Sequence, residues 1–419
     1  MKLFEPNDTL REQMGFSMEN PVCDRYIDVQ NHHLSMSSAD SFLFKGDNRI
    51  WLESLSDSLS NSIDLIYIDP PYNTHGKFLY NDSRKGIGGV HAFGNHSAWM
   101  EFMYERLVSA YKLLKSTGII AISIDDYEQP YLRILMDNVF GEDNLIANIV
   151  VMRSKNGKGS SKNVSHNHEY LLVYGKSDKS RVIGMPVSTE TYDKRDSFGL
   201  YKVDGLFRKK GDASLRIDRP NMFYPLYVSP KDGCVYTSNK LPGLIEVYPL
   251  DSKGVERRWL WGVEKATSES WKLYGSANGV IYVKNYYDAQ KRCKPKSIWD
   301  DNRYLTERAT NEIKEIFGDK IFDTPKPLGL IEDVIDFFSP SDAVVMDFFA
   351  GSGTTAHAVY NLNETHNAQR KVILVEDTQP VDSKHLSYKH GFRDVSDITV
   401  ARLKYLERIS NGRFSSIIV

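Results

Sequence analysis

The sequence predicts an α/β protein with a doubly wound, mostly parallel β-sheet and an inserted β-rich domain. Short apolar runs rich in Val and Ile alternate with helical periodicity over residues 41–140 and again over residues 330–375, which is typical of a parallel sheet covered by helices. Acidic residues or glycines follow these runs, as at the ligand-binding strand ends of such sheets. Between the two regions, residues 181–300 contain short β-like runs separated by turns, which predicts the insert.

Composition places the chain among ordinary globular proteins. Its 419 residues, 41% hydrophobic and 26% charged, are enough for two domains with a substantial core. No window approaches the ~18 consecutive apolar residues of a membrane span, and the polar start is unlike a signal peptide. We therefore expect a cytoplasmic protein without membrane contact.

The cysteines and histidines indicate neither a disulfide framework nor a metal centre. Cys23, Cys234 and Cys293 lie far apart in the sequence and lack a zinc-ligand spacing. The histidines at 32–33 and at 166 and 168 have no neighbouring cluster that would complete a coordination set. We expect free thiols and no metal.

The first α/β region follows an irregular start. Residues 1–40 lack periodicity and are interpreted as an N-terminal arm. The glycine-rich residues 80–97 are predicted to form a loop that could act as a lid over the strand ends. Around this loop, predicted strands alternate with predicted helices, at residues 42–44, 52–59, 65–68, 99–114, 119–124 and 132–140.

The four residues Asp69, Pro70, Pro71 and Tyr72, called the lip below, form the first candidate site. The two prolines lack the N–H groups of a sheet ladder, so they end the preceding strand and make a rigid segment. The lip sets an acidic acceptor, Asp69, near an aromatic ring, Tyr72, where open α/β sheets bind ligands. This arrangement suits a planar ring that bears an amino group, although the same four residues in isolation could be a simple turn.

The middle of the chain is basic and aromatic. Residues 151–300 hold 27 Lys and Arg against 16 Asp and Glu, whereas the rest of the chain holds 26 against 39. Positive charge and aromatic rings together indicate nucleic-acid binding, by phosphate neutralisation and base stacking. The alternative is a β-rich insert with a hydrated, positive surface. The candidate contacts include the tryptophans Trp259, Trp261, Trp271 and Trp299 and the basic cluster Arg208, Lys209 and Lys210.

The second candidate site is a glycine turn between a strand over 344–348 and a helix over 356–360. Gly351 and Gly353 let the backbone approach a ligand, and the helix start offers free N–H groups. Their spacing fits neither the dinucleotide fingerprint nor a triphosphate loop. A later strand ends in Glu376, whose carboxylate can accept both hydroxyls of a ribose. Together these features describe an adenosine pocket without phosphates, which S-adenosylmethionine fits, although each feature alone is common in ordinary strand–turn–helix units.

The lip and residues 349–353, in that chain order, resemble the β class of DNA amino-methyltransferases, in which the catalytic half precedes the cofactor half. The similarity is greatest to the modification subunits of type III restriction systems, and it covers roughly residues 41–175 and 320–405. It extends to residues 46–48, 124–126, 140–144, 324–327 and 347–359. The resemblance implies the circularly permuted fold of S-adenosylmethionine-dependent methyltransferases, divided into an arm (1–40), a catalytic half (41–175), an inserted target-recognition domain (176–300) and a cofactor-binding half (301–419).

The same resemblance implies roles for the motif residues. In the lip, Asp69 and the Pro70 carbonyl would accept the two hydrogens of a target amino group, while Tyr72 would stack on the base. The resemblance places Asp47 and Lys326 near the cofactor. Asp47 could instead cap the next helix, and Lys326 could be a surface lysine on a turn. Asn73, Thr74 and Asp125 could line the site or only make turn and strand-end contacts. The implied cofactor residues are Asp47, Lys326, Asp347, Phe349, Gly351, Gly353 and Glu376.

The predicted activity is site-specific methylation of adenine N6 in double-stranded DNA, on a base flipped out of the duplex. Two alternatives stay open. Cytosine N4 offers the same amino chemistry, and Asp69 only favours adenine; a catalytically silent DNA-binding relative is the other. The family resemblance further implies a homodimer and a restriction subunit as partner, although the chain is shorter than the usual modification subunit and contains no helicase or nuclease sequence.

Overall fold

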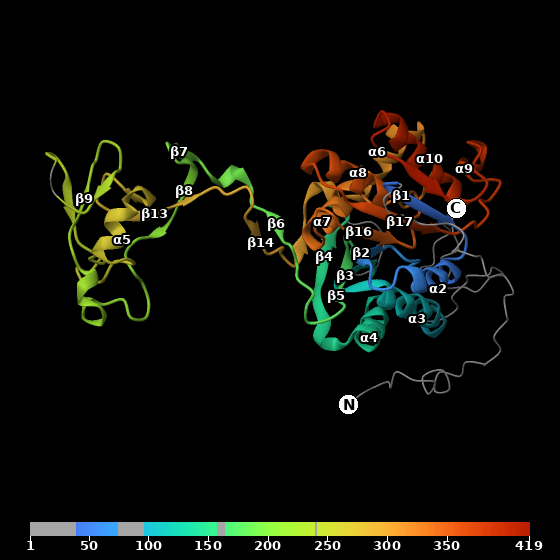
Figure 1. Cartoon of the computed structure of the whole chain (residues 1–419), viewed down its shortest axis with the longest axis horizontal. Coiled ribbons are helices and arrows are strands. Elements are labelled where there is room, and N and C mark those ends of the chain that lie inside the picture. Colours follow the sequence, from blue (N-terminus) through green and yellow to red (C-terminus); the bar gives the residue numbers. More distant parts are fainter. Residues whose placement is uncertain (1–38, 74–95, 157–163, 239–240) are drawn as a thin grey trace. The chain divides into compact units, whose positions relative to one another are not determined.

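The computed structural model in Figure 1 describes residues 39–73, 96–156, 164–238 and 241–419. The chain separates into two compact units, one made of Met1–Met185 with Lys294–Val419 and the other of Pro186–Cys293. Almost all of the predicted arm over 1–40 and most of the predicted loop over 80–97 lie outside the described residues.

The larger unit is built on one nine-stranded sheet with the order β15-β4-β5-β3-β2-β16-β17-β1-β18. Neighbouring strands are parallel except where β5 pairs with β3 and with β4. The predicted mostly parallel sheet is therefore confirmed. The strands are β1 (Ser41–Lys45), β2 (Ile63–Ile68), β3 (Leu114–Ile124), β4 (Leu145–Met152), β5 (His168–Gly175), β15 (Ile298–Trp299), β16 (Val344–Asp347), β17 (Lys371–Glu376) and β18 (Ser416–Ile418).

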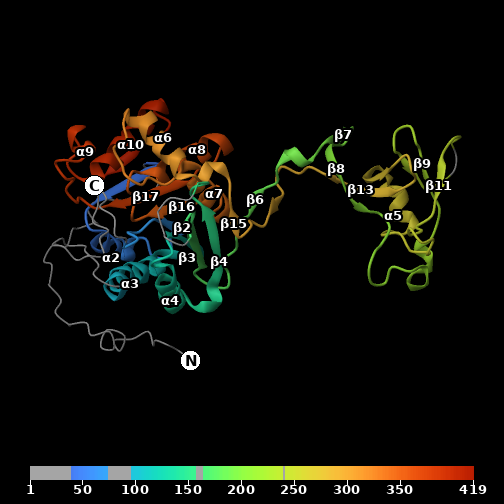
Figure 2. The same cartoon turned by 180° about the vertical axis from the view of Figure 1, so that it is seen from behind.

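Helices cover both faces of this sheet, as Figures 1 and 2 show. Successive residues of β2 point to opposite faces, so Ile66 and Ile68 join one hydrophobic core while Leu65 and Tyr67 join the other. The first core includes residues of α2, α3 and α4, and the second includes residues of α7, α8 and α10. No helix in the described part of the chain is long and apolar enough to cross a membrane. The helices are α2 (Asn48–Ser58), α3 (His96–Leu113), α4 (Gln129–Phe140), α6 (Thr306–Phe317), α7 (Leu328–Phe338), α8 (Thr354–His366), α9 (Leu386–Lys389) and α10 (Val395–Ile409).

The direction of winding changes between β16 and β2, the parallel neighbours at the middle of the sheet. From β2 the chain passes through α3 to β3 on one side, whereas from β16 it passes through α8 to β17 on the other. Two strands whose connections diverge leave a crevice at their carboxyl ends, and ligands of open α/β sheets bind there. The fold therefore places the lip and the glycine turn at the two sides of one crevice.

The smaller unit is β-rich. Its sheets have the orders β12-β13-β8-β7 and β10-β9-β11. A common core of apolar side chains, with Phe207 and Trp259 among the largest, joins strands of both sheets. The elements are β7 (Lys194–Asp196), β8 (Gly199–Leu206), β9 (Leu226–Val228), β10 (Val235–Tyr236), β11 (Ile245–Val247), α5 (Val263–Ser268), β12 (Leu273–Gly275) and β13 (Ile281–Tyr286), with the short strands β6 (Met185–Pro186) and β14 (Arg292–Cys293) near its ends.

Two of the predicted aromatic contacts are core residues. Trp299 belongs to β15, which pairs with β4 of the large sheet, and its ring packs against Phe337 and Phe338. Trp259 is only 2% exposed in the core of the smaller unit. Neither ring is available for stacking on a base. The smaller unit ends at Cys293, before the predicted domain end at residue 300, because the residues around Trp299 pack on the large sheet.

Candidate active site

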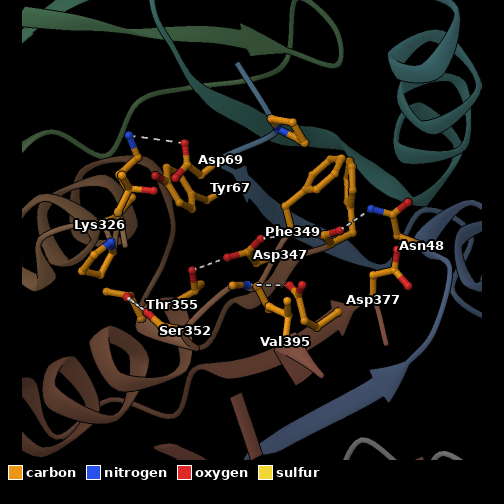
Figure 3. Close-up of a pocket in the computed structure, with 18 of the residues that line it drawn as sticks. Asn48, Tyr67, Asp69, Lys326, Asp347, Phe349, Ser352, Thr355, Asp377 and Val395 are labelled. Carbon is orange, nitrogen blue, oxygen red and sulfur yellow. Dashed lines mark hydrogen bonds and ion pairs between the residues drawn. The ribbon is translucent and has the colours of Figure 1, made fainter. Parts of the chain in front are cut away.

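A pocket opens at the carboxyl ends of β2, β16 and β17, where the strand order changes direction (Figure 3). It has about 930 Å³ of empty space, part of it open to solvent. Seven of the eleven predicted site residues line this pocket: Asp69, Pro71, Lys326, Asp347, Phe349, Gly351 and Glu376.

The remaining four predicted residues lie outside the lining. Asp47 caps α2 by accepting a hydrogen bond from the backbone N–H of Arg49 at 2.7 Å, so it fills the capping role, and its role at the cofactor stays a prediction. Gly353 precedes α8 with a φ of +78°, a left-handed conformation that favours glycine. Pro70 is buried and Tyr72 half-buried in the lip next to the pocket.

The lip is held in place by helix α3 and by the start of α4. The Trp99 indole N–H of α3 donates a hydrogen bond to the Pro71 carbonyl at 2.7 Å, and the Trp99 side chain is fully buried. Asn73, directly after the lip, adopts a left-handed φ of +53° and donates from its side chain to Glu128 at 2.8 Å. These contacts fix the backbone on which Asp69 is carried. Thr74 lies outside the described residues.

The Asp69 carboxylate lies beside a lysine. The Lys326 Nζ is 3.3 Å from Asp69 Oδ1, and the two side chains are 12% and 22% exposed. Burial raises the pKa of Asp69 above its ordinary value, while the Lys326 charge acts in the opposite direction. Lys326 is therefore not a surface lysine but part of the pocket, on the side of the lip.

Glu169 is a site residue that sequence reasoning missed. It lies on β5, is 4% exposed, and receives two hydrogen bonds from the Lys326 Nζ at 2.9 and 2.8 Å. Burial alone would raise the pKa of Glu169, but Lys326 and Arg153 bring it below the ordinary value. One local signal could have revealed it, because a charged residue next to the apolar run of β5 needs a partner.

The glycine turn starts from a buried carboxyl group at the end of β16. Asp347 accepts hydrogen bonds from the Phe349 backbone N–H at 3.0 Å and from the Thr355 hydroxyl at 2.5 Å. Burial raises the pKa of Asp347 to about 7. Gly351 has a φ of +54°, and a Cβ atom there would lie 3.3 Å from the Phe322 ring, so the turn requires glycine at this position.

Glu376 ends β17 and closes the pocket on the side of the glycine turn. Its carboxylate accepts a hydrogen bond from the Gly351 backbone N–H at 2.5 Å. Burial raises the pKa of Glu376 to about 8. A carboxyl group with this pKa is mostly protonated at neutral pH but can be ionised at small cost. A ligand that donates hydrogen bonds to it would favour the ionised form.

Two further residues, which were not among the predicted site residues, support the aromatic part of the pocket. The Asn48 side chain donates to the Phe348 carbonyl at 2.6 Å, and Arg106 Nε donates to the Asn48 side-chain oxygen at 2.5 Å. The Arg106 guanidinium lies 3.6 Å from the centre of the Phe102 ring, which is 6.0 Å from the Phe349 ring. This chain of contacts joins α2 and α3 to the turn after β16.

Asp125, the acid after β3, does not line the pocket. Its carboxylate accepts hydrogen bonds from the backbone N–H groups of Tyr127 and Glu128, at 3.0 and 3.3 Å. Burial raises its pKa to about 6. The residue therefore ends its strand and organises the following turn, as in the second of the two expected roles.

The ionisable groups of the pocket suit a cationic ligand better than a phosphate, because a cation would stabilise the ionised forms of the carboxyl groups. Among the described lining residues, two cations, Arg106 and Lys326, face four carboxyl groups, and both cations already contact carboxylates. In the described part of the chain, His, Cys, Asp and Glu form no group of three or more that could hold a metal ion. The four carboxyl groups belong to Asp69, Asp347, Glu376 and Asp377.

Comparison with known proteins shows which proteins this chain is similar to. A DNA methylase family model matches residues 63–376. The type II methyltransferase M.KpnI of Klebsiella pneumoniae is 55% identical over 371 residues, which cover 88% of each chain. The EcoPI Mod subunit of a type III restriction-modification enzyme, from Escherichia phage P1, is 33% identical over 416 residues, which cover 90% of this chain and 63% of that subunit. Among solved structures, a Thermus thermophilus protein described as a DNA modification methylase, in complex with S-adenosyl-L-methionine, matches 90% of this chain and 98% of its own with 14% identity and a TM-score of 0.41.

Proposed function

Since the chain belongs to the N6/N4 family of DNA methylases, we propose that it methylates the N6 amino group of adenine at a specific site in double-stranded DNA, with S-adenosylmethionine as the methyl donor. The observation that carries this proposal is the position of Asp69 and of the glycine turn at the adjacent carboxyl ends of β2 and β16, in one pocket. An acceptor for amino hydrogens and a place for the donor thus lie side by side.

The pocket has the chemistry that S-adenosylmethionine requires. When bound, this cofactor supplies a methyl group on a positively charged sulfur. Glu376 would accept the ribose hydroxyls, and Phe349 would contact the adenine ring. The surplus of carboxyl groups over cations in the lining suits a ligand with a positive sulfur and an ammonium group.

Asp69 is the residue proposed to act on the target base. The exocyclic nitrogen of adenine is a poor nucleophile because its lone pair is delocalised into the ring. If Asp69 accepts one amino hydrogen and the Pro70 carbonyl the other, the nitrogen becomes more pyramidal and its lone pair is freed for attack on the methyl carbon. The cofactor would supply the methyl group, and its sulfur would keep the electron pair of the carbon–sulfur bond. Asp69 would take the proton that the nitrogen then loses.

Tyr72 is proposed to stack on the base once it has left the duplex. A paired adenine cannot reach the lip, so the base must be flipped out at a cost of a few kcal/mol. The Tyr72 hydroxyl lies 2.5 Å from Lys326 Nζ and 3.5 Å from Glu169 Oε2, and these contacts hold its ring in one orientation. A fixed ring loses less conformational freedom when the base arrives.

The smaller unit is proposed to contact the DNA as the target-recognition domain. Its residues 186–293 hold 18 Lys and Arg against 13 Asp and Glu, so the segments on either side of it carry the rest of the basic surplus of residues 151–300. Positive charge spread over the unit and its flanks suits a long duplex better than a single phosphate group.

The partners and the cellular setting are proposed from the relatives. One relative is named as a type II methyltransferase and the other as the Mod subunit of a type III restriction-modification enzyme, and the chain spans 63% of the length of that subunit. We propose a restriction-modification setting in the cytoplasm, with a homodimer as the active form. Light scattering at micromolar concentration tests the dimer, and a monomer in the presence of DNA would contradict it.

The decisive experiment is mapping of methylated positions in DNA from cells that express the protein. We expect N6-methyladenine within one recurrent sequence, and the same DNA from cells that express the Asp69→Ala variant is the control. N4-methylcytosine in place of N6-methyladenine would show that cytosine is the target. No methylation at all would leave a catalytically silent DNA-binding protein.

A further inference from the structure

One lysine links a buried and a half-buried carboxylate at the edge of the pocket. Asp69 follows β2, Glu169 lies on β5, and Lys326 lies in the segment between α6 and α7, so the three residues come from distant parts of the chain. Lys326 Nζ is 2.8 Å from Glu169 Oε2 and 3.3 Å from Asp69 Oδ1. The three side chains are between 5% and 22% exposed. Charges held in such surroundings interact more strongly than they would in water.

The contacts of Lys326 are unequal, and the difference matters for Asp69. Lys326 donates two short hydrogen bonds to Glu169, whereas its contact with Asp69 is single and longer. Glu169 thus holds the ammonium group at a distance from Asp69. The Asp69 carboxylate gains a compensating charge yet keeps lone pairs for the hydrogens of a target amino group.

The backbone around Lys326 adds rigidity to this arrangement. Pro325 and Pro327 flank the lysine, and each restricts the backbone at its own position and at the residue before it. The Lys326 Nζ also lies 4.9 Å from the centre of the Tyr72 ring, whose hydroxyl it contacts. One cation therefore positions both the proposed acceptor and the proposed stacking ring.

We propose that Lys326 and Glu169 are positioning residues for methyl transfer: Glu169 holds Lys326 in place, and Lys326 keeps Asp69 ionised and oriented to accept an amino hydrogen. The inference rests on the proposed function of Asp69. It assigns Lys326 to the target base, rather than to the cofactor as the family resemblance implies. It also assigns a role to Glu169, which no motif contains.

The proposal makes the two residues act on Asp69 in opposite directions. Burial raises the pKa of Asp69, Lys326 lowers it, and Glu169 raises it further. The acid limb is the part of the pH–rate profile in which the rate falls as Asp69 becomes protonated. Loss of the lysine should therefore move the acid limb to higher pH, and loss of the glutamate charge should move it to lower pH. A purely structural defect would lower the rate without moving the limbs in opposite directions.

Other charged groups that face these residues stay unchanged in both variants. Arg153 Nη1 lies 3.9 Å from Glu169 Oε2, and the Tyr72 hydroxyl contacts Lys326 Nζ and Glu169 Oε2. The Asp347 carboxyl group and the Tyr67 hydroxyl also interact with this cluster. Because all four are common to the wild type and the variants, differences between the profiles report the lysine and the glutamate.

The test measures kcat and KM for methyl transfer to unmethylated genomic DNA between pH 5.5 and 9, with the full chain and saturating S-adenosylmethionine. We expect Lys326→Met to lower kcat about 100-fold at pH 7.5 and to move the acid limb up by about one pH unit. Glu169→Gln should also lower kcat but should move the limb down. Lys326→Arg, which keeps the charge, should leave the limb in place.

Controls separate this role from folding and from cofactor binding. Lys115 of β3 forms an ion pair at 2.7 Å with Asp64 of β2, the strand that Asp69 follows. Neither residue lines the pocket, so Lys115→Met should keep the wild-type profile. The double variant Lys326→Met/Glu169→Gln removes both charges of the buried pair and covers the case in which a single variant does not fold. It should transfer methyl groups about as slowly as Lys326→Met, and it should bind S-adenosylhomocysteine within about threefold of the wild type, since neither residue is assigned to the cofactor.

Two failures can be told apart. If the wild type methylates DNA but the limbs of the two single variants stay in place or move together, the positioning role is wrong and the proposed function stands. A loss of S-adenosylhomocysteine affinity above threefold in the double variant would show that Lys326 binds the cofactor, as the family resemblance implies, and would overturn its assignment to the target base. A wild-type chain that transfers no methyl group would overturn both proposals.

Discussion

Cofactor affinity should depend on pH through Glu376, and the Glu376→Gln variant isolates this dependence. The pKa of Glu376 is raised to about 8 by burial in the ligand-free protein. If the cofactor binds only when the carboxylate is ionised and can accept the ribose hydroxyls, protons and cofactor compete. Gln keeps the size of the side chain and one acceptor oxygen but has no charge to titrate.

The expected size of the effect follows from this pKa. At pH 6, two units below the pKa of about 8, only about 1% of the molecules carry the ionised carboxylate, so the apparent affinity should be about 100-fold weaker than at high pH. This factor corresponds to about 2.7 kcal/mol. In Glu376→Gln, affinity at pH 9 should fall by about 10- to 100-fold, because hydrogen bonds to a charged acceptor are worth about 1.5–3 kcal/mol.

Calorimetric titration with S-adenosylhomocysteine at pH 6, 7, 8 and 9 measures this without turnover. The wild-type and Gln curves should lie closest near pH 6, separate as the pH rises through 8, and stay apart at pH 9. In wild-type protein at pH 7, binding should release about 0.9 proton from Glu376, seen as a dependence of the heat on the buffer. Titration of the ligand and of Asp347 is common to both proteins and cancels in the comparison.

The same slope of affinity against pH in wild type and Glu376→Gln would refute this reasoning. An affinity that falls as the pH rises would show that the neutral carboxyl group is the binding form. Either result would remove Glu376 from its proposed role at the ribose.

Three further outcomes are expected. Asp69→Ala should abolish methyl transfer while calorimetry shows cofactor affinity within about tenfold, because the side chain acts on the base; full activity would overturn its assignment. Charge reversal of Arg208, Lys209 and Lys210, of which Lys210 is exposed, should weaken DNA binding and flatten its salt dependence, and an unchanged slope would place the DNA elsewhere. Trp99→Phe, which loses the hydrogen bond to the lip, should lower the free energy of unfolding in urea by about 1–3 kcal/mol and reduce kcat, whereas unchanged kinetics would show that the lip holds without it.

Much of the site could be predicted because its parts are local. Two prolines must end β2 whatever surrounds them, and the turn after β16 needs glycine because Gly351 has a positive φ. Glu376 follows an apolar strand directly, so its place at a strand end could be predicted from its neighbours alone. The alternation of strands and helices also predicts a parallel sheet, whose carboxyl ends gather such residues at one edge.

Roles that depend on distant partners could not be predicted in this way. The sequence allows both a cofactor role and a helix cap for Asp47, and only the structure shows that it accepts a hydrogen bond from the Arg49 backbone as a cap. Trp299 lies in the basic, aromatic segment of the sequence, yet it is 5% exposed in the core of the large unit. Hydrophobic periodicity does not say which side of a domain boundary such a ring will pack on.

The sequence by itself determined the strands, the lip, the glycine turn and their chain order, because backbone preferences and apolar patterning act over a few residues. Only the tertiary structure decided that Lys326 meets Glu169, a residue 157 positions earlier, next to Asp69. That contact depends on β5 lying next to β3 in the sheet order, and on the segment before α7 reaching the end of β2. The order of strands is a property of the whole packed core, so residues that meet through it carry no shared local pattern.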